Sequence, residues 1–454
     1  MGGAGRVSSE HSYDVVVAGG GVAGVAAAVS SARQGARTLL IERYGFLGGM
    51  GTAGLVNPFM SSLTSTGRPL VGGFFTEICE RMKELGGLFG RAFDPEAMKF
   101  AAQEMVLEAG GEMLLHTWIT GARMKGVEII GVEALTKAGM RDIDARVVVD
   151  ATGDGDIAVM AGAQYEMGGA DGLTQAMTLM FTVGGVEMRK CLEYALKHPD
   201  QMRFPKPSTR EEIEKMLRGA VGVAGFYKEV DQARENGEFP LPQEMVFFIA
   251  MPTPGQVVVN TTHIGGVHGT DSWDLTKAEI ECRRQAMALM KFFKKYVPGF
   301  ENSYLIQTAP QIGVRETRRI IGEHVFSVED VAEGRKYPDV VMRSAYAVDI
   351  HSPVGRGYVR EDDGKPGIAP QPGDWYEVPY RCLVPLGVEQ LLVAGRCISS
   401  THEGQAAMRI MPNCMALGQA AGTAAALCIE HEVSPRALDA GLLRTALLRE
   451  GAII

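Results

Sequence analysis

One short stretch near the N-terminus restricts the fold of this chain more than any other feature. Residues 15–43 read VVVAGGGVAGVAAAVSSARQGARTLLIER, which is an apolar run, a glycine turn, an alanine-rich segment and a second apolar run. Gly19, Gly21 and Gly24 have the GxGxxG spacing. These glycines permit a tight turn, a close approach of a pyrophosphate and close packing of helix on strand. The stretch therefore predicts a βαβ unit with a dinucleotide at the start of its helix.

The second apolar run ends in an acidic residue, Glu42, which follows Gly24 by 18 positions. A carboxylate at this distance commonly accepts hydrogen bonds from the adenosine ribose of a dinucleotide. The motif does not distinguish NAD from FAD, so an NAD-dependent dehydrogenase without flavin stays open on these residues alone.

A second strand, turn and helix follow near the C-terminus. Residues 391–394 form an apolar run that leads through Gly395 and Arg396 to a helix expected to start near Pro412. Neither of the two residues before this proline offers a side-chain oxygen as a cap. The N–H groups of Asn413 and Cys414 are then available to a ligand that develops negative charge, such as a reduced flavin, or to water and loop carbonyls. A low-pKa Cys414 thiol is conceivable at a helix start, but a buried, inert thiol is the better prediction.

Three blocks carry a resemblance to a known superfamily. Residues 13–54, "VVVDATGDGDIAVMAGA" at 147–163 and "LLVAGRCISSTHEGQAAMRIMPNCMALGQAAGTAAA" at 391–426 resemble the FAD-dependent oxidoreductases of the glutathione-reductase superfamily. The group related to succinate dehydrogenase and fumarate reductase flavoproteins is the most similar. The segment "PQIGVRETRRIIGEH" resembles the same group.

The resemblance implies FAD as the bound dinucleotide and assigns residues to it. The residues implied to hold the ADP half, the pyrophosphate and ribityl chain, and the flavin are, in chain order, Gly19, Gly21, Gly24, Glu42, Arg43, Gly48, Gly49, Met50, Gly153, Asp154, Gly395, Arg396, Asn413 and Cys414. Covalently flavinylated members carry a histidine after the first βαβ unit, and this chain has none between His11 and His116. The FAD is therefore expected to be non-covalent. The cysteine pair of the disulfide reductases is missing as well, so no disulfide relay is expected.

Composition excludes several classes of protein. Lys and Arg number 45 against 54 Asp and Glu, a formal net charge of −9, and no basic run suggests a nucleic-acid partner. The 7 cysteines contain no CxxC pair, so we expect neither a metal site nor an iron–sulfur cluster. No apolar run reaches the ~18 residues of a membrane span, and no signal peptide is recognised. We therefore expect a cytoplasmic protein without a membrane span.

The order of motifs predicts an α/β fold with an interrupted nucleotide domain. We expect a Rossmann-like FAD-binding domain in two parts, residues 13–165 and 381–454, and an inserted α+β substrate or cap domain at residues 166–380. In the insert, residues 275–299 form an amphipathic pattern in which Thr276 and Glu279 fit a capping box.

Two histidines and two arginines are the candidates for chemistry beside the cofactor. His351 follows Asp349 by two positions, so in an extended segment a carboxylate lies beside the imidazole. His402 follows the strand at residues 391–394, at the sheet edge where ligands collect. Arg315 and Arg318 are candidates to clamp an anionic or carbonyl group, against the alternative that this arginine cluster, with Arg319, forms salt bridges to neighbouring glutamates.

These residues predict an FAD-dependent oxidoreductase that moves a hydride between FAD and a small organic substrate. A fumarate reductase-like alkene reductase and a flavin-bearing electron-transfer subunit stay open as alternatives. A homo-oligomer or an electron-accepting partner also stays open.

Overall fold

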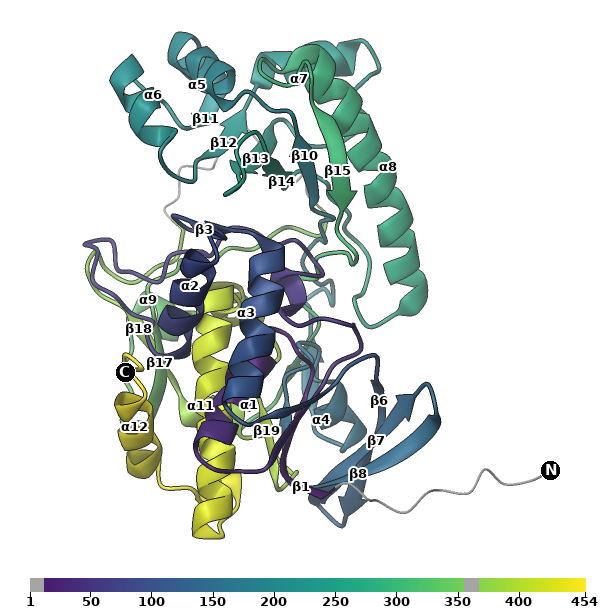
Figure 1. The fold of residues 1–454 in the computed structure, drawn as a ribbon, viewed down its shortest axis with the longest axis vertical. Coiled ribbons are helices and arrows are strands. Elements are labelled where there is room, and N and C mark those ends of the chain that lie inside the picture. Colours follow the sequence, from purple (N-terminus) through teal and green to yellow (C-terminus); the bar gives the residue numbers. More distant parts are fainter. Residues whose placement is uncertain (1–11, 355–366) are drawn as a thin grey trace, which may run out of the picture.

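The computed structural model describes residues 12–354 and 367–454 of the 454-residue chain. Two sheets build it, each covered by its own helices (Figure 1). The lower part in this view holds both ends of the described chain, and the upper part is made from its middle.

The lower sheet is parallel at its centre and antiparallel at one side. Its strands run in the order β5-β2-β1-β8-β7-β6, and β19 pairs with the last part of β8, with Leu391 opposite Val148. The pairings among β5, β2, β1, β8 and β19 are parallel, and those of β7 with β8 and β6 are antiparallel. The strands are β1 (Ser12–Ala18), β2 (Thr38–Ile41), β5 (Glu112–Leu114), β6 (Trp118–Lys125), β7 (Glu128–Thr136), β8 (Gly139–Asp150) and β19 (Leu391–Val393).

Two helices from opposite ends of the chain pack directly on each other beside this sheet. A Cβ atom on Gly418 or Gly422 of α11 (Met411–His431) would lie 2.0 or 2.1 Å from the carbonyl oxygen of Ala23 or Ala27 of α1 (Val22–Arg33). Only glycine allows this approach, so the N-terminal and C-terminal blocks share one core. The other helices of this part are α2 (Phe74–Glu84), α3 (Pro95–Glu108), α4 (Asp156–Met160), α9 (Val328–Ala332), α10 (His402–Met408) and α12 (Ala440–Arg449).

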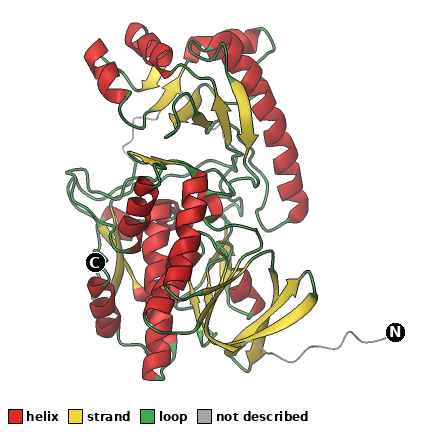
Figure 2. Ribbon diagram, viewed as in Figure 1, coloured by secondary structure: helices red, strands yellow, loops and turns green. Residues whose placement is uncertain are grey.

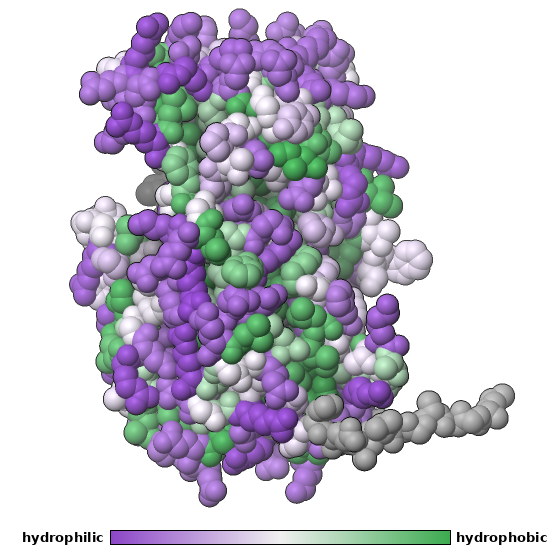
Figure 3. All heavy atoms as spheres, in the orientation of Figure 1, coloured by the Kyte–Doolittle hydropathy of each residue, from purple (hydrophilic) through white to green (hydrophobic). Residues whose placement is uncertain are grey.

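The upper sheet is antiparallel throughout, in the order β11-β12-β13-β14-β10-β15. The long helix α8 (Ser272–Tyr296) lies along it, and α5 (Met188–Lys197), α6 (Arg210–Met216) and α7 (Tyr227–Glu235) cover its outer end (Figures 1 and 2). Phenylalanine rings fill its core, among them Phe181, Phe248 and Phe293. Hydrophilic residues cover this outer end (Figure 3). The strands are β10 (Phe181–Gly184), β11 (Met202–Phe204), β12 (Gly222–Gly225), β13 (Val246–Ala250), β14 (Val257–Val259) and β15 (Tyr304–Thr308).

The start of α8 corrects one prediction. The helix begins at Ser272, and the Asp271 side chain caps it by accepting hydrogen bonds from the N–H groups of Trp273 and Asp274. Thr276, predicted as the cap, lies inside the helix, where its hydroxyl donates to the Ser272 carbonyl at 2.7 Å. The capping-box prediction was therefore wrong, because an aspartate five residues earlier caps the helix better than a threonine can.

Short two-stranded sheets complete the fold. They pair β3 (Leu88–Phe89) with β4 (Ala92–Phe93), β9 (Tyr165–Met167) with β16 (Arg318–Ile320), and β17 (Val340–Ser344) with β18 (Tyr376–Pro379). Ile320, Met342 and Tyr376 lie in the same apolar cluster as β1 and α11. The predicted α/β class, with a Rossmann-like parallel sheet and an additional sheet part, is confirmed. The predicted division at residues 165 and 380 stays a prediction. In the described residues, no helix is long and apolar enough to cross a bilayer.

Candidate active site

A pocket opens where the parallel strands β1, β2, β8 and β19 end. Its space measures about 1060 Å³, open mouth included. Ligands in open parallel sheets collect at this edge, so the topology alone favours a ligand here. Eleven of the fourteen residues predicted to contact the cofactor line the pocket: Gly19, Gly21, Glu42, Arg43, Gly49, Met50, Gly153, Asp154, Gly395, Arg396 and Cys414.

The glycine turn has the geometry that the motif predicts. Gly19 adopts φ +95°, and a Cβ atom there would lie 2.7 Å from the carbonyl oxygen of Ala151. Gly24 lies behind the pocket wall, where a Cβ atom would meet the Gly19 carbonyl oxygen at 1.8 Å. Gly21 begins α1 and no side chain caps the helix, which leaves its first N–H groups to an anion in the pocket.

Glu42 is held against this turn. One carboxylate oxygen accepts a hydrogen bond from the Gly20 N–H at 2.6 Å, and the other accepts from the Tyr44 N–H at 2.9 Å. A carboxylate has about four lone-pair sites, so Glu42 retains capacity for ribose hydroxyls. Beside it, the Arg43 guanidinium lies over the rings of Tyr44 and Trp118, at 5.1 and 5.2 Å.

The next glycines support the turn from the opposite side. The Gly48 N–H donates to the Gly20 carbonyl at 2.8 Å, and Gly48 adopts φ +105°. A Cβ atom on Gly49 would lie 2.7 Å from the Cα atom of Gly21. Gly49 and Met50 reach the pocket, whereas Gly48 itself lies behind it.

The Arg396 guanidinium also lines the pocket, and one of its nitrogens has no hydrogen-bond partner. Arg396 donates to Asp154 at 3.1 Å, and Asp154 also accepts from the Thr317 hydroxyl at 2.7 Å. The other terminal nitrogen of Arg396, Nη1, is buried without a hydrogen-bond partner. A buried, unpartnered donor of a charged group is costly, so this atom fits a site completed by an anionic ligand such as a pyrophosphate.

Asp156 lines the same pocket and was missed in the sequence. Burial, reinforced by the charges of Asp154 and Asp150, raises its pKa to about 6. Its partner is Arg318, whose guanidinium also lies over the Tyr165 ring at 5.9 Å. Arg318, predicted as a substrate clamp, is therefore paired with a pocket residue without lining the pocket itself, and it is not brought together with the two histidines.

The start of α11 contributes Met411 and Cys414 to the lining of the pocket. As expected, no side chain caps this helix. The N–H of Cys414 is nevertheless used inside the helix, where it donates to the Ile410 carbonyl at 3.0 Å, so the prediction that it is available was wrong. Asn413 is buried behind the pocket, and its side-chain oxygen has no partner. Cys414 is buried, as predicted, and burial raises the pKa of its thiol to about 12, which disfavours a reactive thiolate.

A charged cluster adjoins this end of the pocket and contains His351. Its Nε2 lies 3.6 Å from Asp349, and Asp349 accepts from the guanidinium of Arg409, a pocket residue, at 3.4 Å. Burial, together with the positive charge of Arg315, lowers the pKa of His351 to about 4 despite Asp349. Burial alone would raise the pKa of Asp349, but His351, Arg409 and Arg315 hold it well below its usual range.

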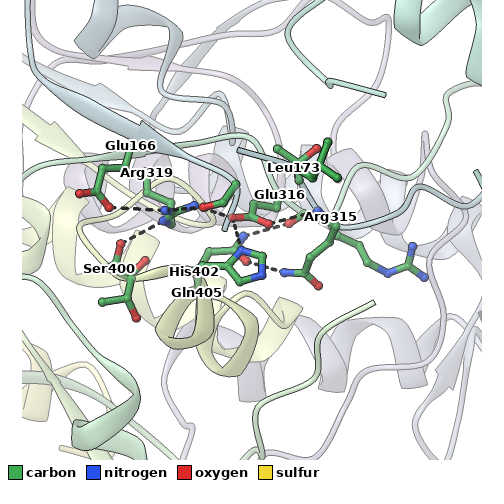
Figure 4. Close-up of polar contacts among 12 residues, drawn as sticks. Glu166, Leu173, Arg315, Glu316, Arg319, Ser400, His402 and Gln405 are labelled. Carbon is green, nitrogen blue, oxygen red and sulfur yellow. Dashed lines mark hydrogen bonds and ion pairs between the residues drawn. The ribbon is translucent and has the colours of Figure 1, made fainter. Parts of the chain in front are cut away.

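His402 lies in a second cluster, at the start of α10 (Figure 4). Its Nδ1 is 2.8 Å from the carboxylate of Glu316, which is fully buried. The same carboxylate oxygen accepts from the Arg319 guanidinium at 2.5 Å. The alternative predicted for Arg319, a salt bridge to a neighbouring glutamate, is therefore present.

Gln175 joins the two clusters. Its backbone N–H donates to Glu316 at 3.2 Å, and its side-chain oxygen accepts from the backbone N–H of His351 at 3.2 Å. Its side-chain nitrogen donates to Gln405, which in turn donates to the Arg315 carbonyl at 2.9 Å. The Arg315 side chain points away from His402 (Figure 4) and donates to the Ala176 carbonyl and the Thr178 hydroxyl.

The sequence carried one signal for the residues that were missed here. His402, Gln405 and Arg409 recur at the spacing of a single helix face, and α10 with its C-cap residue Arg409 presents all three to Gln175 or the groups it contacts. Glu316 follows Arg315 in the sequence, which predicts a salt-bridge partner but not its contact with His402.

The sequence matches no curated protein. Among solved structures, a geranylgeranyl bacteriochlorophyll reductase-like protein from Thermoplasma acidophilum is 13% identical, with 93% of this chain and 80% of that chain covered and a TM-score of 0.42. L-proline dehydrogenase from P. horikoshii is 12% identical (93% and 94% covered, TM-score 0.41). The myxobacterial chondrochloren halogenase is 13% identical (97% and 79% covered, TM-score 0.47).

A protein-family model gives the assignment. The model described as FAD dependent oxidoreductase matches residues 14–447, nearly the whole described chain, and its span includes every block that forms the pocket. The chain therefore belongs to the FAD dependent oxidoreductase family.

Proposed function

We propose that this FAD-dependent enzyme transfers a hydride between non-covalently bound FAD and a small organic substrate that carries an anionic group. Bound FAD supplies the group that accepts or gives the hydride. The observation that carries the proposal is the position of Arg409, which lines the cofactor pocket and also contacts the cluster of Asp349 and His351.

In this proposal the fourteen residues predicted from the sequence form the FAD site, and each contributes according to where it lies relative to the pocket. Gly19, Gly21 and the uncapped start of α1 hold the pyrophosphate, with Glu42 and Arg43 at the ADP half. The unpartnered nitrogen of Arg396 supports this placement. Gly24, Gly48 and Asn413 act from behind the pocket wall, and the remaining residues line it.

Charge favours an anionic substrate group. Arg315 and Arg409 bring two positive charges to the cluster, against one negative charge from Asp349. The Nε of Arg409 is buried without a hydrogen-bond partner. A substrate carboxylate would satisfy such a donor with a charge-assisted hydrogen bond.

His351 is the proposed proton acceptor. Its lowered pKa leaves the imidazole neutral at pH 7, so it can take a proton from a substrate O–H or N–H group. Asp349 holds the ring, and its negative charge stabilises the imidazolium that forms. His402, in the neighbouring cluster, is the second proposed proton-transfer group.

We also propose that the chain is related to the succinate dehydrogenase and fumarate reductase flavoproteins. Two arginines beside a histidine favour alkene reduction of an unsaturated acid as the second candidate, since they would polarise its carboxylate. We also propose a cytoplasmic location, because all 7 cysteines are free thiols in the structure and thiols stay reduced in the cytosol.

The test is anaerobic mixing of the oxidised protein with hydroxy acids and amino acids, and of the reduced protein with unsaturated acids, followed by flavin absorbance. Bleaching of the oxidised flavin by a hydroxy acid or an amino acid, or reoxidation of the reduced flavin by an unsaturated acid, identifies the direction of the hydride transfer. The variant Arg409→Gln is expected to raise KM on the order of tenfold to hundredfold, because a charge-assisted hydrogen bond contributes ~1.5–3 kcal/mol.

The matched control is Arg283→Gln, which changes an arginine paired with Glu279 on the surface of α8. It should leave KM and kcat as in the wild type. Unchanged kinetics in Arg409→Gln would contradict the proposed role of the cluster.

A further inference from the structure

We propose that Glu316 and Arg319 are positioning residues for His402. They hold its ring in the tautomer with hydrogen on Nδ1, and they leave Nε2 as a hydrogen-bond acceptor. The inference rests on the proposed function, in which His402 transfers a proton.

The carboxylate of Glu316 can only accept hydrogen bonds here. Two donors converge on it, the backbone N–H of Gln175 at 3.2 Å and the Arg319 guanidinium at 2.5 Å, and His402 Nδ1 lies 2.8 Å from it. An acceptor-only partner requires the hydrogen to be on Nδ1. In a neutral imidazole, Nε2 then carries a lone pair.

Arg319 fixes both the carboxylate and the helix that carries the histidine. Its Nε donates to the Ser400 carbonyl at 3.1 Å, two residues before His402, and another nitrogen donates to the Gly168 carbonyl at 3.0 Å. Figure 4 shows its guanidinium between Ser400, Glu166 and Glu316. Arg319 and Glu316 are almost completely buried. Rotation of Glu316 away from His402 would remove the nearer carboxylate partner of a buried guanidinium and leave it only Glu166, at 3.5 Å, which disfavours the rotation.

The Nε2 side of the ring faces a glycine. A Cβ atom on Gly169 would lie 3.8 Å from Nε2 and 3.7 Å from Cδ2 of His402, both ordinary contacts. Gly169 does not have a positive φ, so alanine fits its backbone. A larger residue at this position would therefore cover Nε2 without straining the chain, and Gly169 leaves it accessible.

The first measurement is ¹⁵N NMR of the FAD-loaded protein with labelled histidine. The wild type is expected to show His402 with hydrogen on Nδ1 and a lone pair on Nε2. Hydrogen on Nε2 in the wild type would overturn the proposal.

Variants then separate positioning from folding. The double variant Glu316→Leu/Arg319→Met removes both buried charges together, so neither is left unpaired and folding should be retained. It should lose the fixed tautomer and lower kcat about tenfold with little change in KM, a part of the ~10²–10⁴ that a positioned acid or base contributes. Glu316→Gln keeps an oxygen acceptor and should retain the tautomer. A fixed tautomer in the double variant would contradict the role of Glu316.

Two further variants distinguish this inference from the proposed function. Arg189→Met/Glu214→Leu changes an exposed ion pair in the same way and should leave the His402 signals unchanged. Gly169→Leu should lower kcat while the tautomer stays fixed. If the NMR result holds but His402→Gln keeps full activity, the positioning stands and the proposed proton transfer by His402 fails.

Discussion

The contact between α1 and α11 gives a prediction whose sign is not obvious. In Gly418→Ala the new Cβ atom would lie 2.0 Å from the carbonyl oxygen of Ala23, whereas ordinary contact starts at 3.4 Å. One helix must therefore move by about 1.4 Å. Overpacking costs ~1–3 kcal/mol, and alanine returns up to ~1 kcal/mol of helix propensity. Because a helix carbonyl cannot rotate away, we place the overpacking cost at the upper end of its range, ~3 kcal/mol, and expect a net destabilisation of about 2 kcal/mol.

Urea unfolding followed by far-UV circular dichroism measures this change. Since Ala23 lines the cofactor pocket, Gly418→Ala should also bind FAD more weakly, which flavin fluorescence measures. The control is Glu430→Ala, at an exposed position near the end of the same helix. It should change stability by less than ~0.5 kcal/mol. A Gly418→Ala protein as stable as the wild type would refute the packing argument.

Three further predictions concern the site. If His351 must be neutral to accept a proton, substrate oxidation should stay constant from pH 8 to about 5 and fall as pH drops through about 4; a midpoint near 6.5 in the kcat/KM profile would contradict the lowered pKa. Because Asp156, with a pKa of about 6, becomes negative beside the cofactor, the Kd of FAD should rise between pH 5.5 and 7.5, and Asp156→Asn should remove this dependence in a fluorescence titration. Glu42→Ala should raise the Kd of FAD on the order of tenfold or more, since the Gly20 and Tyr44 N–H groups lose their acceptor, and unchanged binding would count against the role of Glu42.

The nucleotide part of the fold was predictable because its signals are local. The spacing of Gly19, Gly21 and Gly24 and the apolar runs around them determine a turn, a helix and two strands within thirty residues. The helix α3 is a similar case, since Asp94 caps it and Pro95 occupies its first position. In both cases the residues that decide the structure are neighbours in the chain.

The charged clusters were only half predictable, because tertiary pairing decides which side chains meet. Arg315, Arg318 and Arg319 lie within five residues of one another, yet their side chains contact three different groups: the Ala176 carbonyl and Thr178 hydroxyl, Asp156 in the cofactor pocket, and the buried Glu316. Arg409 contacts Asp349 across sixty residues. Periodicity in the sequence does not predict such tertiary pairings.

The central claim is that the pocket at the ends of the parallel strands binds FAD without a covalent bond. The most direct test is the visible spectrum of the purified protein before and after heat denaturation and removal of the precipitate. We expect flavin absorption that passes completely to the supernatant, with one FAD per chain. A colourless protein that takes up no added FAD, or flavin that stays with the precipitate, would contradict the account.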